Sequence, residues 1–256
     1  MADEGLVAVL RSITGSWKMP MAYYLIKGSP KCFMAQVNEC LKAAAEAGVE
    51  VLVFTCDQCT TQWSSMIKVG VSVEHPYFIH PVSHKKVFVF ADIPHCLKNC
   101  RNALRTNRIE FESGKFARWD DFTKLWELEC GNQLKFNSKL TINHVELPVG
   151  ANMKVKVAAQ TLSRRTAAAI RCYYRLNMIQ KCALDTAEFM ERVGDLFHLG
   201  NSVSPCDEDR KSSVTLLNVE SKLAAMKNGI LWIGKWKFHF TKNGKQNNHH
   251  TFNHGS

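Results

Sequence analysis

The stretch Val51-Leu52-Val53-Phe54-Thr55-Cys56-Asp57 decides the fold of this chain. Its four consecutive apolar residues are typical of a strand that is buried on both faces. A second run of this kind, Val87–Phe90, ends at Ala91-Asp92. Helical patterns follow each run, over residues 60–69 and 94–104. This alternation predicts a mixed sheet covered by helices.

The residues before this stretch predict a hairpin and a helix. Apolar runs at 5–11 and 19–26 flank the turn-forming residues 12–16. Ser29-Pro30 then opens an amphipathic stretch that ends before Gly48. One face of this predicted helix carries Phe33, Val37, Cys40, Leu41 and Ala44.

The pattern changes near residue 110, and helical periodicity dominates from about Asp120. The predicted helices are 120–131, 139–147, 153–175, 185–199 and 213–227. The polar segment 201–213 is predicted to be a loop, and the Asn-, His- and Gly-rich tail from 241 to be disordered. We therefore expect an α/β domain over 1–112, an all-α domain over 113–240 and a disordered tail over 241–256.

The composition indicates an ordinary globular protein with a basic balance. The 256 residues are 46% hydrophobic and 22% charged, and the formal net charge is +10. This charge suits a polyanionic partner such as DNA or a nucleotide, although a solvated basic surface is the alternative. No apolar run is long enough to span a membrane, and no signal-peptide core is evident. We expect the ten cysteines to be reduced thiols in the cytoplasm or nucleus, with the nucleus favoured for a DNA-binding protein.

Two aspartates follow the two apolar runs. Ligands collect at the carboxyl ends of parallel strands, and carboxylates there can hold a hard cation such as Mg2+. If the strands are neighbours, Asp57 and Asp92 would reach one crevice, which suits metal-assisted phosphoryl transfer. The alternative is that each aspartate only caps the helix that follows it.

Basic residues gather on two predicted helices. His95, Lys98 and Asn102 share one helix face with Arg101 beside them, which could bind phosphates at the mouth of the acidic site. Arg164 and Arg165, with Arg171 and Arg175, give a second basic stretch that could contact DNA phosphates. Solvated helix faces are the alternative for both.

Cysteines around the acidic site suggest two other chemistries. Cys56-Asp57-Gln58-Cys59 has the Cys-x-x-Cys spacing of redox domains, so an oxidoreductase is a competing interpretation. It would require a cysteine of lowered pKa at a helix N-terminus. A zinc site of Cys56, Cys59, Cys96 and Cys100 is less favoured than buried thiols, because structural zinc sites usually lie on turns.

Several segments resemble P element and THAP-type DNA transposases. They include Gly15–Leu25, with Trp17-Lys18-Met19-Pro20-Met21-Ala22-Tyr23-Tyr24, then Phe54-Thr55-Cys56-Asp57-Gln58, and then Asp92-x-x-His95-x-x-Lys98-x-x-Arg101-Asn102. Met153–Ser163 and Asp195–Ser202 are similar to the family's insertion domain. The similarity extends with gaps from about residue 3 to 240, with the motifs in the family's order.

The resemblance implies a ribonuclease H-like domain in which three acidic residues hold Mg2+ for DNA cleavage and strand transfer. Asp57 matches the second of these acidic residues. The family places the first on a strand before the hairpin and the third beyond the insertion domain, so neither is expected in this chain. The zinc-coordinating DNA-binding domain is not expected either. On this basis we expect no autonomous cleavage.

The resemblance also implies a GTP-binding insertion domain. Lys139, Lys154 and Val155 match family positions near the nucleotide. An aspartate reads guanine in the family's Asp-x-x-Asn pattern, whereas this chain has His198-x-x-Asn201. Imidazole offers at most one acceptor, so we expect weak or absent GTP selectivity, with Asp195 as a possible substitute acceptor. The alternative is a helical packing domain without a ligand.

These observations leave three kinds of protein open. The first is a transposase derivative whose implied partners are DNA at transposon ends and further copies of the chain. The second is a module that binds nucleic acid or nucleotide without catalysis. The third is a remnant without function.

Overall fold

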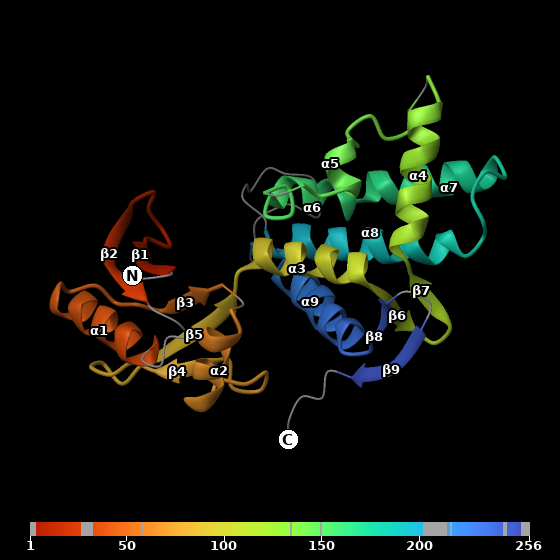
Figure 1. The fold of residues 1–256 in the computed structure, drawn as a ribbon. Coiled ribbons are helices and arrows are strands. Elements are labelled where there is room, and N and C mark those ends of the chain that lie inside the picture. The colour runs from red at the N-terminus through yellow and green to blue at the C-terminus, as the bar shows by residue number, and fades with distance from the viewer. Residues whose placement is uncertain are drawn as a thin grey trace. The chain divides into compact units, whose positions relative to one another are not determined.

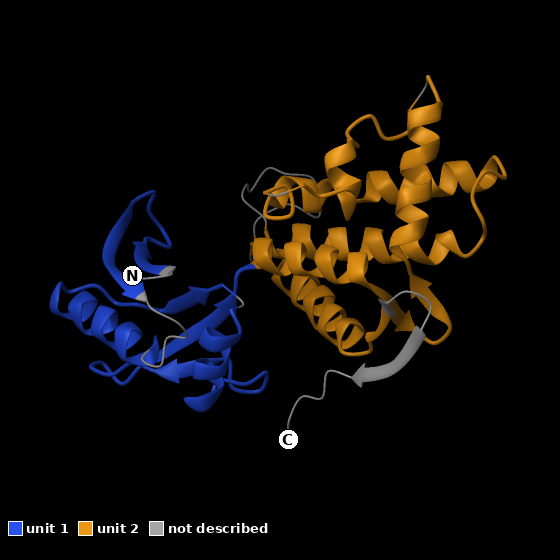
Figure 2. Ribbon diagram, in the orientation of Figure 1, with its two compact units in different colours: residues 1–92 blue, residues 93–256 orange. Residues whose placement is uncertain are grey.

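The computed structural model describes residues 4–26, 33–57, 59–133, 135–148, 150–201, 214–215, 217–242 and 245–251. The chain divides into two compact units, residues 1–92 and 93–256 (Figure 2). The sequence placed the boundary near 112, but α3 (Ile93–Thr106) and β6 (Asn107–Glu112) pack with the later helices. Leu97, Leu104, Ile109 and Phe111 all belong to the core of the second unit.

Unit 1 holds a hairpin, a three-stranded sheet and two helices. These are β1 (Glu4–Arg11), β2 (Lys18–Ile26), α1 (Phe33–Glu46), β3 (Val53–Cys56), α2 (Thr60–Lys68), β4 (Tyr77–Ile79) and β5 (Lys86–Ala91) (Figure 1). The hairpin, α1, α2 and the pairing of β3 with β5 confirm the sequence predictions, whereas β4 was not predicted. The order β3-β5-β4 is mixed, because β3 runs parallel and β4 antiparallel to β5.

One face of this sheet packs against the helices of unit 1. Phe33, Val37 and Leu41 of α1 form a buried cluster with Val87 and Val89 of β5. The other face exposes Val53, Phe88 and Phe90. The prediction of strands buried on both faces was therefore wrong for this unit. Successive residues of a strand point to opposite faces of the sheet, and α1 and α2 cover only one of these faces.

Unit 2 is mainly helical, as predicted, and also contains a small sheet that was not predicted. Its further elements are β7 (Lys115–Ala117), α4 (Trp119–Gly131), α5 (Ile142–Val145), α6 (Val155–Thr161), α7 (Arg164–Arg175), α8 (Ala183–Gly200), α9 (Val219–Ile233), β8 (Lys237–Lys242) and β9 (Lys245–Thr251). The strands pair in the order β7-β6-β8-β9. Within the tail that was predicted to be disordered, β9 pairs through its backbone with β8. Residues 252–256 lie outside the described residues.

The helix predicted over 153–175 is two helices. Leu162 ends α6, and the Ser163 side chain caps α7 by accepting a hydrogen bond from the Thr166 N–H at 3.2 Å. Gly194 of α8 packs against this break, where a Cβ atom would lie 2.7 Å from the Leu162 carbonyl oxygen. The predicted helix 139–147 shortens to α5, and the helix predicted over 213–227 begins at Val219 and runs on to Ile233. The predicted loop falls outside the described residues from 202 to 213.

Candidate metal and nucleotide sites

The strand register of unit 1 brings two carboxylates together. Cys56 lies opposite Ala91 in the parallel pair, so the next residues, Asp57 and Asp92, lie at the same edge of the sheet. The Asp92 N–H donates to the Cys56 carbonyl oxygen at 3.3 Å, which holds the two strand ends together. Carboxylate oxygens of the two aspartates lie within 4.8 Å of one another.

This pair fits a hard divalent cation. Mg2+ takes oxygen ligands at about 2.1 Å, so two carboxylates at this separation can share one ion after small side-chain rotations. Asp57 is exposed and Asp92 is half-buried, which leaves the pair open to solvent on one side. The site is therefore accessible to an ion that keeps part of its water shell.

The cysteines beside this pair do not support thiol chemistry. Burial, followed by the charges of Asp57 and Cys59, raises the pKa of Cys56 to about 11. A redox or metal-ligating cysteine needs a lowered pKa, because the thiolate is the reactive form. Burial also raises the pKa of Cys100 to about 12. The cysteines of the described residues are free thiols.

The residues predicted to form a phosphate-binding stripe on α3 do not all lie on one side of the helix. His95 Nε2 and Lys98 Nζ lie 3.4 Å apart on the half-buried side of the helix. Arg101 instead lies on the buried side with Leu97 and Leu104, and it is 0% exposed. Asn102 accepts a hydrogen bond from Arg101 Nε at 2.9 Å, so it orients that guanidinium. The spacing 97, 101, 104 is helical and could have revealed this from the sequence.

The expected nucleotide residues lie on three segments of unit 2. Lys154 and Val155 are the N-cap and first residue of α6, and His198 and Asn201 end α8. Gly200 lies against Ile93 at the start of α3, and Arg101 donates to the carbonyl oxygen of Asn152, next to α6. Figure 1 shows these ends of α3, α6 and α8 at the same end of unit 2. The end of α8 thus lies at the start of α3, and the segment before α6 contacts α3 at Arg101, so the candidate residues other than Lys139 lie along α3.

Lys139 belongs to a separate turn that the buried Glu129 holds. The Glu129 carboxylate is 0% exposed and accepts the N–H groups of Phe136 and Asn137 at 3.0 and 3.2 Å. Asn137 Nδ2 donates to Thr166 Oγ1 at 3.1 Å, which ties this turn to α7. Sequence reasoning missed Glu129, because its partners are backbone groups that no motif marks.

Two predicted roles are changed by one ion pair. Arg164 Nε and Nη2 donate to the two carboxylate oxygens of Asp195 at 2.6 and 3.2 Å. Arg164, a DNA candidate, is thereby engaged with α8, and both carboxylate oxygens of Asp195 accept from Arg164. Arg171 is likewise paired with Glu191 at 2.6 Å. Arg165 and Arg175 are exposed cations of α7.

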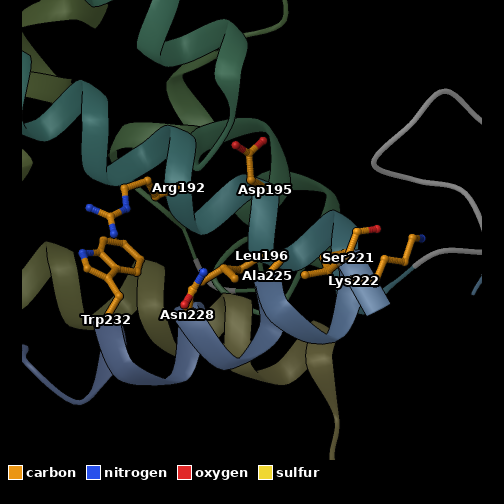
Figure 3. A pocket seen from close by; sticks show the side chains of 10 residues that line it. Arg192, Asp195, Leu196, Ser221, Lys222, Ala225, Asn228 and Trp232 are labelled. Carbon is orange, nitrogen blue, oxygen red and sulfur yellow. The ribbon is translucent and has the colours of Figure 1, made fainter. Parts of the chain in front are cut away.

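A cavity of about 430 Å³ lies between α8 and α9 (Figure 3). Arg192 lies over the Trp232 ring on its wall, with 4.1 Å between the guanidinium carbon and the ring centroid. His198 and Asn201 do not line this cavity. Asp195, the possible substitute guanine acceptor, lines it, whereas the other residues expected to bind nucleotide do not.

Comparisons with known proteins agree with both halves of this description. The family described as TNP-like, RNase H N-terminal domain matches residues 1–70, and the TNP-like, GTP-binding insertion domain matches residues 94–213. The Transposable element P transposase of Drosophila melanogaster is 27% identical over 240 residues, which cover 90% of this chain and 31% of that protein. Human DNA transposase THAP9 is 26% identical over 216 residues, 79% of this chain and 23% of that protein.

A solved structure shows the same architecture. The chain superposes on the Drosophila P element transposase strand transfer complex with a TM-score of 0.76 and 25% identity, over 96% of this chain and 54% of that chain. The chain spans less than a third of the length of the two curated relatives. The fold, both domain matches and the sequence similarity show that the chain carries the TNP-like RNase H N-terminal and GTP-binding insertion domains and is homologous to the P element transposase and to THAP9.

Proposed function

We propose that this chain provides the DNA- and nucleotide-binding part of a P element-type transposase. The observation that carries the proposal is the gathering of Lys154, Val155, His198 and Asn201 around α3, inside the region that matches the GTP-binding insertion domain. The net charge of +10 supports a polyanionic partner, and DNA is the partner that the solved relative's name implies. Further copies of the chain and a nuclear location are part of the same proposal.

DNA binding through phosphates has a distinctive salt dependence. Each phosphate contact releases counterions, so affinity falls steeply as salt concentration rises. A mobility shift with duplex DNA, repeated between about 50 and 200 mM salt, tests this. Binding that is undetectable at the lowest salt concentration would remove DNA from the proposal.

Nucleotide selectivity is the second part of the proposal. Guanine presents two neighbouring N–H donors, which one carboxylate can accept together. Neutral imidazole offers a single acceptor and imidazolium none, so His198 gives little preference for guanine over adenine. Titration with GTP and with ATP in the presence of Mg2+ tests this. A tight, Mg2+-dependent preference for GTP would contradict it.

The catalytic part concerns Asp57 and Asp92. These residues would hold Mg2+, which supplies charge stabilisation and an activated oxygen nucleophile in phosphoryl transfer. The resemblance implies three acidic residues for cleavage, of which Asp57 matches the second, so we propose that the Asp57–Asp92 pair binds a cation and does not by itself support cleavage. Mg2+-dependent nuclease activity that disappears in Asp57→Ala would overturn this and favour an active enzyme.

No helix among the described residues is long and apolar enough to cross a membrane.

A further inference from the structure

Arg101 is a buried cation without a counter-ion among the described residues. Its side chain is 0% exposed, and its hydrogen-bond acceptors are neutral: the Asn102 side-chain oxygen and the Asn152 carbonyl oxygen. Nη1 is buried and has no partner within the described part of the chain. Buried charges are normally paired, because desolvating an ion is costly. The guanidinium therefore carries a positive charge that no described residue neutralises.

Within the described part of the chain, the surroundings of Arg101 add positive charge and no acidic partner. Burial lowers the pKa of Arg101, and the neighbouring charge of Arg105 lowers it further. Arg105 Nη2 donates to the Glu146 carbonyl oxygen at 3.1 Å, so both arginines of α3 bind the connection that leads to α6. Lys154, at the end of that connection, is exposed. Arg101 and Lys154 therefore suit a ligand that carries several negative charges, whereas Arg105 is engaged with the Glu146 carbonyl oxygen.

The segment that Arg101 contacts is exposed to solvent. The Arg101 partner Asn152 and the next residue, Met153, are both exposed, and Met153 is 69% exposed. A small anion therefore needs only a local shift of this connection to reach Nη1. A DNA duplex is too bulky to reach a fully buried guanidinium, so a free polyphosphate is the ligand that the geometry favours.

We propose that Arg101 is a phosphate-binding residue of the nucleotide site, with Nη2 holding the Asn152 carbonyl and Nη1 donating to a nucleotide phosphate. The inference rests on the proposed nucleotide binding and assigns to Arg101 the phosphate end of that ligand. A charge-assisted hydrogen bond to phosphate is stronger than one to a carbonyl. Arginine suits this role because its planar fork donates in two directions at once.

The test compares ligands that differ in phosphate content. Binding of GTP, ATP, tripolyphosphate and guanosine is measured by calorimetry for the wild type, Arg101→Gln and Arg101→Lys. Arg105→Gln is the matched control, since Arg105 lies one turn further along α3 and also holds a carbonyl of the connection. Arg101→Gln should weaken GTP, ATP and tripolyphosphate by about tenfold or more. It should leave guanosine unchanged within about twofold, a difference too small to represent a hydrogen bond.

Arg101→Lys and Arg105→Gln distinguish the loss of positive charge at residue 101 from a general change in the structure of α3. Arg101→Lys should bind tripolyphosphate more tightly than Arg101→Gln does, because it keeps the charge. Arg105→Gln should bind all four ligands about as the wild type does. Unchanged GTP affinity in Arg101→Gln would overturn the inference, as would an equal loss for GTP and guanosine, which would mark a merely structural residue.

Amide hydrogen exchange of the wild type tests the same inference if Arg101→Gln does not fold. In the wild type, tripolyphosphate should slow amide hydrogen exchange over residues 146–154, and guanosine should not. No slowing by tripolyphosphate would overturn the inference. Nucleotide binding that is insensitive to Arg101 leaves the proposed function intact, whereas a wild type that binds neither nucleotide nor tripolyphosphate removes both.

Discussion

Asp195 and Arg164 form a two-point ion pair between α8 and α7, with nitrogen–oxygen distances of 2.6 and 3.2 Å. Asp195 lies one helical turn before His198, where it was a possible substitute for a guanine-reading carboxylate. Its two oxygens instead accept from the Arg164 guanidinium, so we propose that base recognition depends on His198 and Asn201. The pair also engages one of the arginines expected to contact DNA.

His198→Asp should create a preference for GTP over ATP. A carboxylate at this position can accept both guanine N–H donors, and a hydrogen bond to a charged group contributes about 1.5–3 kcal/mol. We therefore expect the ratio of ATP to GTP dissociation constants to rise about tenfold or more, measured by calorimetry with Mg2+.

Asp195→Asn is the control for this variant. It removes one charge from the same helix turn but from a residue that faces Arg164, so base selectivity should stay as in the wild type. A base selectivity that changes in Asp195→Asn but not in His198→Asp would mean that Asp195, and not His198, recognises the base.

Local signals in the sequence predicted the elements of unit 1 well. The helix α1 begins after Ser29-Pro30 and ends before Gly48, whose φ of +74° suits glycine. The strand ends at Asp57 and Asp92 were also predicted, because parallel neighbours align their carboxyl ends. Each of these predictions depends on residues close together in the sequence.

Features that depend on distant partners were not predictable in this way. The break at Leu162 accommodates Gly194 of α8, 32 positions away, and nothing in the helical pattern of 153–175 marks it. The engagement of Arg164 by Asp195 depends on how α7 packs against α8. The exposed face of Phe88 and Phe90 reflects which helices cover the sheet, whereas an apolar run records only hydrophobicity.

Cys56 and Cys59 should differ in reactivity towards a thiol reagent. Burial and nearby negative charge raise the pKa of Cys56 to about 11, so this thiol stays protonated at all pH values well below 11. Cys59 is exposed. At pH 8 we expect a maleimide to label Cys59 first and Cys56 slowly, with Cys56 labelling rising towards pH 11, as read by mass spectrometry of peptides.

Comparison with Cys59→Ser isolates the signal of Cys56. Rapid labelling of Cys56 at mildly acidic pH would show a lowered pKa and would revive the oxidoreductase interpretation. Slow labelling that accelerates with pH agrees with a buried structural thiol.

Asp57→Asn and Asp92→Asn should each weaken divalent cation binding. Each substitution removes one of two charged oxygen ligands, so we expect about a tenfold or greater loss of affinity for Mn2+ used in place of Mg2+. Electron paramagnetic resonance of free Mn2+ measures the bound fraction. Asp120→Asn, an exposed aspartate of α4, is the charge-matched control and should have no effect. Equal Mn2+ binding in all four proteins would show that the two strand-end aspartates hold no ion.

Gly194→Ala tests whether the break between α6 and α7 is fixed by α8. The added Cβ would lie 2.7 Å from the Leu162 carbonyl oxygen and 3.3 Å from the Ser163 Cα, both backbone atoms. Relief requires the helices to move apart, and overpacking of this kind costs about 1–3 kcal/mol. Thermal unfolding should therefore show a Tm several degrees below the wild type. Gly131→Ala, at the end of α4 with no atom within 4 Å of its Cβ, should leave the Tm unchanged or slightly raised. Equal Tm values for the two variants would mean that α8 does not press against Leu162, and that Ser163 alone, through its cap, separates the two helices.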